Sequence, residues 1–232
     1  APAGFQTFID VGAWTMVSFL IGHLGPAALA ASVIALSINN IYFVPLLGLS
    51  DSTAIVVGQY IGRQRHGIAQ QAAYRAWRIS AVYAFCGVLV YMLLPGTLAE
   101  FFSPAQQSSV DFAEVSNICV GVLAAAALFN ACDSIKFVFM GAMRGAGDTV
   151  AIFLLNSLTA WGLLVPGTLL LTLVFRASIY VVWSFVAMVC VIDAMIFLWR
   201  FQSGKWKTIK LISHTEAEPL EVEQAVYDRI TS

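Results

Sequence analysis

The sequence predicts an all-α integral membrane protein with about six transmembrane helices. Hydrophobic residues make up 59% of its 232 positions and charged residues 11%, and the mean hydropathy is +0.82. Soluble domains contain roughly 45–50% apolar and 25% charged residues. The apolar residues also gather in long runs, and a helix needs about 20 of them to cross a hydrocarbon core of about 30 Å.

These runs divide residues 1–203 into six expected membrane spans. The second run is longer than a crossing requires, and Pro45 and Gly48 predict a kink in it. Residues 204–232 are interpreted as a solvated tail, because five acidic residues follow Ser213. The spans are expected near residues 4–23, 28–61, 68–95, 111–143, 150–174 and 178–200.

The positive charges predict how the spans are oriented. Nine Lys and Arg side chains fall on one set of alternate connections, and Arg176 alone falls on the other. Cytoplasmic loops of membrane proteins carry the excess of Lys and Arg, so we expect the C-terminal tail in the cytoplasm. Because residue 1 is alanine, we expect the chain to begin inside a longer protein.

The sequence has no pattern typical of an enzyme. No Ser–His–Asp or Cys–His set is visible, and the Gly-rich residues 144–149 lack the preceding strand and the lysine of a phosphate loop. The four cysteines lie in apolar stretches without CxxC spacing and are interpreted as packing residues. We therefore expect no catalytic residue, no cofactor and no nucleic-acid partner.

Small residues recur where helices would meet. Gly58 and Gly62 lie one turn apart in the second span, and Gly141 and Gly145 do so at the end of the fourth. In a membrane this spacing lets two helix backbones approach closely, so we expect these glycines at helix contacts.

Five ionisable side chains fall within the expected spans: Asp10, Asp51, Asp133, Lys136 and Asp193. Each charge costs about 2.5–3.5 kcal/mol at mid-helix on insertion scales, so these groups are candidates for a functional site. At about 1.5 Å per residue, Asp10 and Asp193 lie roughly 10 Å and Asp133 roughly 15 Å from the cytoplasmic helix ends. The three acids therefore share a depth. For Asp51 and Asp193 an alternative to a functional role is equally well supported. Each acid would then merely pair with a neighbouring helix or extend toward the headgroups.

Two local contacts are expected near the fourth span. Lys136 follows Asp133 by three residues, so both lie on one helical face and are expected to pair, which would make Asp133 a poorer proton carrier. At the inner end of the span, Asp148 or Thr149 is expected to cap the next helix.

Three segments, residues 8–31, 48–62 and 131–149, resemble the C-terminal half of the multidrug and toxic compound extrusion (MATE) family of transporters. The last segment is the most specific. The second lobe of the family typically carries a G-x-x-R-G-x-G-D signature at the inner end of its fourth helix. The signature is seen here as Gly141, Arg144, Gly145, Gly147 and Asp148.

The resemblance implies one six-helix lobe of a twelve-helix transporter in a bacterial inner membrane, with an N-terminal six-helix lobe as its partner. Such a protein exports organic cations or drugs in exchange for Na⁺ or H⁺ by alternating access. The family pattern places the coupling site, including any Na⁺, at Asp10 and Asp133. Phe129 stands where the family often has an aromatic hydroxyl, and Lys136 and Asp193 are not family hallmarks. These three residues are interpreted as modulators of the site.

Two alternatives stay open at this point. A flippase for lipid-linked precursors, from the same superfamily, would share the helix count but would line its cavity with several basic residues, and only Lys136 lies within a span. A half-transporter that has lost transport would act as a membrane scaffold.

Overall fold

The computed structural model describes residues 2–101 and 112–208, and its long helices follow the expected spans. Five are long and apolar enough to cross a membrane, and residues Phe8–Gly22 form a shorter apolar helix. The helices outside the fifth span are α1 (Pro2–Gly22), α2 (Pro26–Gly62), α3 (His66–Leu93), α4 (Pro95–Phe101), α5 (Phe112–Gly145) and α8 (Ile179–Gln202). The short helix α4 lies in the connection between the expected spans at 68–95 and 111–143.

The fifth span, Thr149–Val174, alternates between α-helical and π-helical segments. It begins as α6 (Thr149–Ser157), widens into the π-helical segment η1 (Leu158–Leu164), returns to α7 (Val165–Leu169) and widens again in η2 (Leu170–Val174). π-Helical turns are rare and are frequently found at functional sites.

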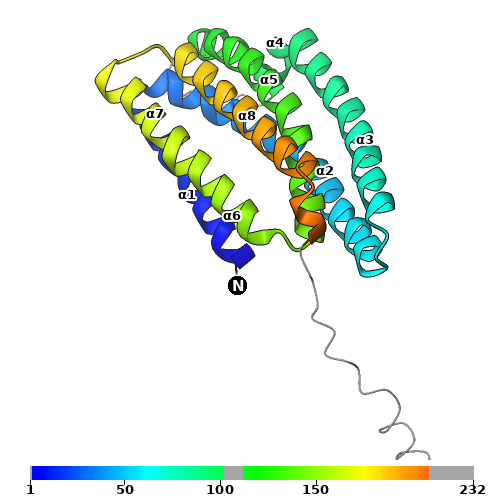
Figure 1. Cartoon of the computed structure of the whole chain (residues 1–232). Coiled ribbons are helices and arrows are strands. Elements are labelled where there is room, and N and C mark those ends of the chain that lie inside the picture. Colours follow the sequence, from blue (N-terminus) through cyan, green and yellow to red (C-terminus); the bar gives the residue numbers. More distant parts are fainter. Residues whose placement is uncertain (1, 102–111, 209–232) are drawn as a thin grey trace, which may run out of the picture.

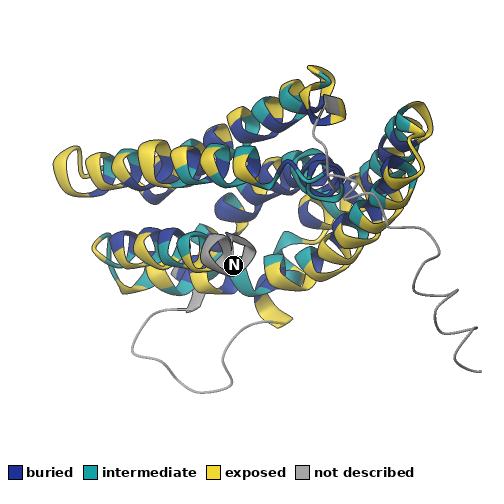
Figure 2. Cartoon of the chain, turned by 60° about the horizontal axis from the view of Figure 1, so that its bottom comes forward, coloured by how far each residue is buried: buried dark blue, intermediate teal, exposed yellow. Residues whose placement is uncertain are grey.

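Helix α5 stands at the centre of the bundle, where it packs against α2, α3 and α8. Helix α1 contacts mainly the fifth span, and the two run side by side at one edge of the molecule, opposite α3 (Figure 1). Buried residues face the interior of the bundle, whereas the outer faces of the helices are exposed (Figure 2). Those outer faces carry large apolar side chains such as Val44, Leu93 and Trp199, as expected for contact with lipid.

The close contact of α5 with α2 depends on the predicted glycines. A Cβ atom at Gly141 would collide with the backbone carbonyl of Ser50, and one at Gly145 would collide with that of Ala54. At Gly58 a Cβ atom would lie 3.2 Å from the carbonyl oxygen of Gly145. The expected helix contact is therefore found at these three glycines, whereas Gly62 faces open space.

The buried interior consists of two apolar clusters with a polar layer between them. In α5 the first cluster includes Ala127 and the second begins at Phe139, and in α8 the corresponding residues are Val189 and Phe197. The polar layer thus falls at the same level in both helices. In the fifth span it lies between Leu155, which packs on the second cluster, and Leu164 of the first.

The lobe continues past the expected boundary at residue 203. Segment η3 (Lys205–Thr208) turns back onto the bundle, where Trp206 is buried and stacks on Phe201 with ring centroids 5.1 Å apart. The Trp206 indole donates a hydrogen bond to the Phe201 carbonyl at 2.8 Å. These residues belong to the packed bundle and not to a solvated tail, while the acidic stretch after Ser213 lies outside the described residues.

Candidate functional site

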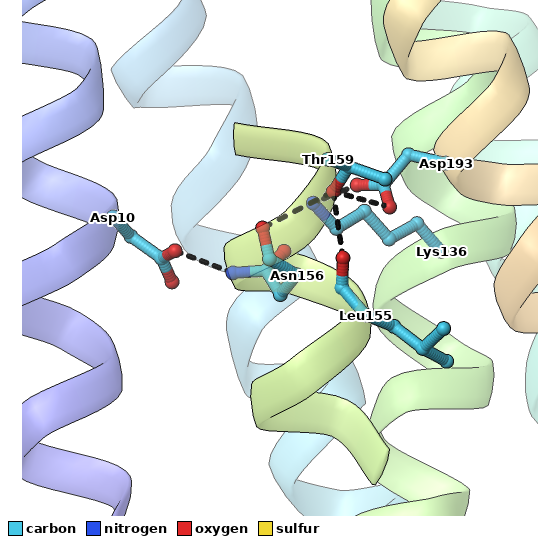
Figure 3. Close-up of polar contacts among 6 residues, drawn as sticks. All are labelled: Asp10, Lys136, Leu155, Asn156, Thr159 and Asp193. Carbon is cyan, nitrogen blue, oxygen red and sulfur yellow. Dashed lines mark hydrogen bonds and ion pairs between the residues drawn. The ribbon is translucent and has the colours of Figure 1, made fainter. Parts of the chain in front are cut away.

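A chain of polar contacts crosses the polar layer and joins four helical segments (Figure 3). On α8, Asp193 forms an ion pair with the Lys136 ammonium of α5, and Nζ lies 2.5 Å from Oδ2. Its other oxygen lies 3.1 Å from the Thr159 hydroxyl of η1, which donates to it. One turn earlier, the Asn156 amide donates to the Asp10 carboxylate of α1.

The fifth span positions both linking side chains. Asn156 and Thr159 are three residues apart, so they lie on one side of the helix, where Asn156 reaches α1 and Thr159 reaches α8. The Thr159 hydroxyl is also 3.1 Å from the carbonyl oxygens of Leu155 and Asn156. A hydroxyl has one proton, so it donates to one of these acceptors at a time.

The ammonium of Lys136 is enclosed on several sides. The side chain is 17% exposed, that of Asp193 is 7% exposed, and Lys136 Nζ lies 5.7 Å from the Phe137 ring centroid and 5.8 Å from that of Phe197. Both rings are within the distance at which an aromatic face attracts a cation. The pair is therefore held by charge, packing and the neighbouring aromatic rings together.

The expected pairing of Lys136 with Asp133 is wrong. Both residues lie on one face of α5, but the long lysine side chain extends across to the carboxylate of α8. Asp133 is buried, at 4% exposure, and lies within electrostatic reach of both Lys136 and Asp193. For Asp193 the sequence left pairing with a neighbouring helix as an alternative, and this acid does pair with Lys136 of α5.

The two acids that the family pattern places together lie on helices that do not pack mainly on one another. Helix α1, which carries Asp10, packs mainly on the fifth span, whereas α5, which carries Asp133, packs on α2, α3 and α8. Asp10 is instead connected through Asn156 and Thr159 to Asp193. The three acids do share the polar layer, as their distances from the helix ends predicted.

Aromatic residues of several helices lie near Asp133. Phe129, one turn before it, packs edge-to-face on Trp14 of α1, with ring centroids 5.7 Å apart. Tyr42 of α2 places its phenol within electrostatic reach of Asp133 and stacks on Tyr83 at 4.9 Å. The aromatic hydroxyl near this acid thus comes from a different helix than the family position predicts.

The signature residues shape the turn between α5 and α6. Gly147 has a φ of +81°, and its amide and that of Asp148 donate to the carbonyls of Arg144 and Met143 at 3.0 and 2.9 Å. This left-handed turn favours glycine because a side chain would be strained there. The glycines therefore serve packing and the turn rather than ion binding.

The expected helix cap at this turn is only half right. Asp148 occupies the N-cap position of α6 but makes no capping hydrogen bond with its side chain. Its carboxylate, 6% exposed, accepts from Arg200 Nη2 at 2.8 Å and Nε at 3.0 Å. Arg144 pairs with Asp51 at 2.8 Å on the exposed surface. This ion pair explains the acidic residue at position 51, so Asp51 needs no role in the polar layer.

The site combines three carboxylates with one ammonium. Lys136 compensates Asp193, whereas Asp10 and Asp133 need an added proton or cation if they are to be neutral within the membrane. No group of three His, Cys, Asp or Glu side chains among the described residues converges as in a metal centre. A groove of about 350 Å³ lies between α2 and α3 in the described part of the chain. None of the three acids lines it.

We expect Thr159→Val to destabilise the full-length protein by about 1.5–3 kcal/mol, the range for a hydrogen bond to a charged group. The substitution keeps the side-chain shape but leaves Asp193 Oδ1 without its donor. Thermal unfolding of the purified protein measures the effect. Thr172→Val is the matched control, because that buried hydroxyl contacts only carbonyls of its own helix. Equal shifts for the two variants would contradict a role for the Thr159–Asp193 bond.

The sequence is similar to curated transporters over most of its length. The MatE family model matches residues 2–170. A probable multidrug resistance protein NorM of Pseudomonas putida is 26% identical over 211 residues, covering 91% of this chain and 45% of that protein. The multidrug resistance protein MdtK of Proteus mirabilis is 26% identical over 170 residues, covering 73% of this chain and 36% of that protein. The chain thus spans less than half the length of these relatives.

Solved transporter structures share the fold. A MOP superfamily transporter from Pyrococcus furiosus, described as having a binding pocket of reverse polarity, superposes with a TM-score of 0.80 at 18% identity, covering 90% of this chain and 46% of that one. A MATE protein in complex with MaL6 gives a TM-score of 0.78 at 17% identity, covering 87% and 45%. The family match over residues 2–170 and the membrane-spanning fold lead to one conclusion: this chain belongs to the MatE family of multi-pass membrane transporters.

Proposed function

We propose that this chain is one lobe of a secondary active antiporter that exports organic cations or drugs in exchange for Na⁺ or H⁺. One observation carries the proposal: acids from three helices lie in one polar layer at membrane depth, in a chain of the MatE family. The relatives named as multidrug resistance proteins support the substrate class. The partner is a second six-helix lobe, in the same polypeptide or in another, and the C-terminal end lies in the cytoplasm of a bacterial cell.

The proposed coupling is a competition for negative charge. An organic cation or a coupling ion can neutralise the uncompensated carboxylates, and the arrival of one releases the other. A ligand shifts the balance between inward-facing and outward-facing states only by its difference in affinity for the two. The carboxylates at Asp10 and Asp133 are suited to this role because each lies within the membrane without a charged partner of its own among the described residues.

Efflux of a fluorescent cation from cells that express the full-length protein tests the proposal. We expect Asp133→Asn to abolish efflux, because it removes a buried charge from the centre of the layer, and Asp10→Asn to weaken it. Asp51→Asn is the control, since that side chain is 65% exposed and pairs at the surface. Unchanged efflux in the Asp133 variant at equal protein level would contradict the proposal.

The flippase alternative has less support from the geometry. Recognition of a lipid-linked phosphate would need unpaired basic groups in the cavity, and the ammonium of Lys136 is already paired with Asp193. The scaffold alternative predicts no efflux from wild-type protein. Efflux by wild type would therefore contradict the scaffold alternative, and its absence would contradict the transporter proposal.

A further inference from the structure

Lys136 stands where a dissolved cation would otherwise balance the charge of the layer. We propose that its ammonium is a tethered cation that excludes Na⁺ from Asp193, so that Asp10 and Asp133 are the carboxylates left to exchange their counter-charge. The proposal deepens the transport function proposed above and rests on it for its physiological meaning. Its test, however, measures ion binding directly.

The contacts of Asp193 show how the exclusion works. Oδ2 is 2.5 Å from the ammonium, and Oδ1 is one of the three acceptors within reach of the Thr159 hydroxyl. A Na⁺ ion takes oxygen ligands, and here it would have to displace a charge-assisted bond to reach one. It would also meet the repulsion of an ammonium held at the same carboxylate.

The surroundings of Lys136 hold its ammonium at Asp193. Phe137 and Phe197 flank the ammonium at 5.7 and 5.8 Å from their ring centroids, which favours its staying in place. The tethered charge is therefore kept at a buried acid, Asp193, which is 5% exposed.

Asp10 differs from Asp193 in its partner. Its carboxylate accepts from the neutral amide of Asn156, and an amide contributes a hydrogen bond but no positive charge. The residue is also only half-buried. Lys136 lies within electrostatic reach of Asp10 and of Asp133, but its ion pair among the described residues is with Asp193, so a cation in direct contact with either of the other acids comes from outside the chain, as exchange requires.

Binding of radioactive ²²Na⁺ to the purified full-length protein tests this inference. We expect Lys136→Met to bind Na⁺ at least about tenfold more tightly than wild type, because Asp193 loses its internal cation. Lys136→Arg keeps the charge and is expected to behave like wild type. The double variant Lys136→Met with Asp193→Asn is expected to lose the gained binding. All proteins are measured both with Asp10 intact and in an Asp10→Asn background, so that Na⁺ held by Asp10 is counted separately.

Two results would overturn the inference: no gain of Na⁺ binding in a folded Lys136→Met protein, or wild-type Na⁺ binding that Asp193→Asn abolishes. Folding is checked by size-exclusion chromatography and thermal unfolding, and Lys136→Gln, which also removes the ammonium and keeps Asp193, serves if Lys136→Met does not fold. Failure of the transport proposal looks different. In that case no cation is exported by wild type, whatever the Na⁺ binding of the Lys136 variants.

Discussion

Gly145→Val is expected to prevent stable assembly of the bundle. A side chain at this position would occupy the space of the Ala54 backbone in α2, and a helix backbone cannot move aside as a flexible side chain does. Overpacking in a core typically costs about 1–3 kcal/mol, and a collision with backbone belongs at or above the upper end of that range. We expect a large loss of folded full-length protein in membranes and a lower thermal midpoint for the remainder.

A second glycine provides the control for this prediction. Gly48 lies within α2, faces open space and is exposed. Gly48→Ala is therefore expected to leave the protein unchanged or to stabilise it by up to about 1 kcal/mol, the intrinsic helix preference of alanine. Similar losses for both substitutions would show that any change in these helices is harmful, and the backbone contact at Gly145 would then explain nothing.

Arg200→Met is expected to destabilise the full-length protein by about 3–5 kcal/mol. The substitution leaves Asp148, 6% exposed as a side chain, with a buried charge and no partner, and loss of one member of a buried pair has this cost. It also disconnects α8 from the turn between α5 and α6. Thermal unfolding of the purified protein measures the change.

Two companion variants separate charge from packing. Adding Asp148→Asn to Arg200→Met removes the orphaned charge and is expected to recover much of the stability. Arg144→Met breaks the other pair at the same turn, whose side chains are 38% and 65% exposed, and is expected to cost about 0–1 kcal/mol. If the Arg144 variant were as unstable as the Arg200 variant, burial would not be the deciding factor.

Hydropathy and turn residues were sufficient to predict where the long helices begin and end. Pro26 and Gly22 bound the first connection, and the helices begin and end within a few residues of the expected positions. Hydropathy could not predict the π-helical segments, because it reports which residues prefer lipid and not which carbonyl each amide bonds. It also missed the packing of Trp206, since a single aromatic residue among lysines does not resemble a membrane helix.

The depth of the site was predictable, but its connections were not. Helix rise alone places Asp10, Asp133 and Asp193 at a similar level, whereas the choice of partner for Lys136 depends on which helix stands beside α5. A signal for the linking residues did exist in the sequence. Asn156 and Thr159 are two polar residues at a spacing of three within a largely apolar span, so they lie on one helical face.

The wide turns of the fifth span affect how the chain tolerates changes in length. A π turn accommodates one more residue than an α turn, because its hydrogen bonds run from i to i+5. Removing one residue from Leu158–Leu164 can therefore be absorbed by closing that stretch into an ordinary α-helix, with the flanking faces kept in register. The same deletion in α8 would rotate Asp193 away from Lys136, so the two neighbouring spans differ in the insertions and deletions that homologous sequences can carry there.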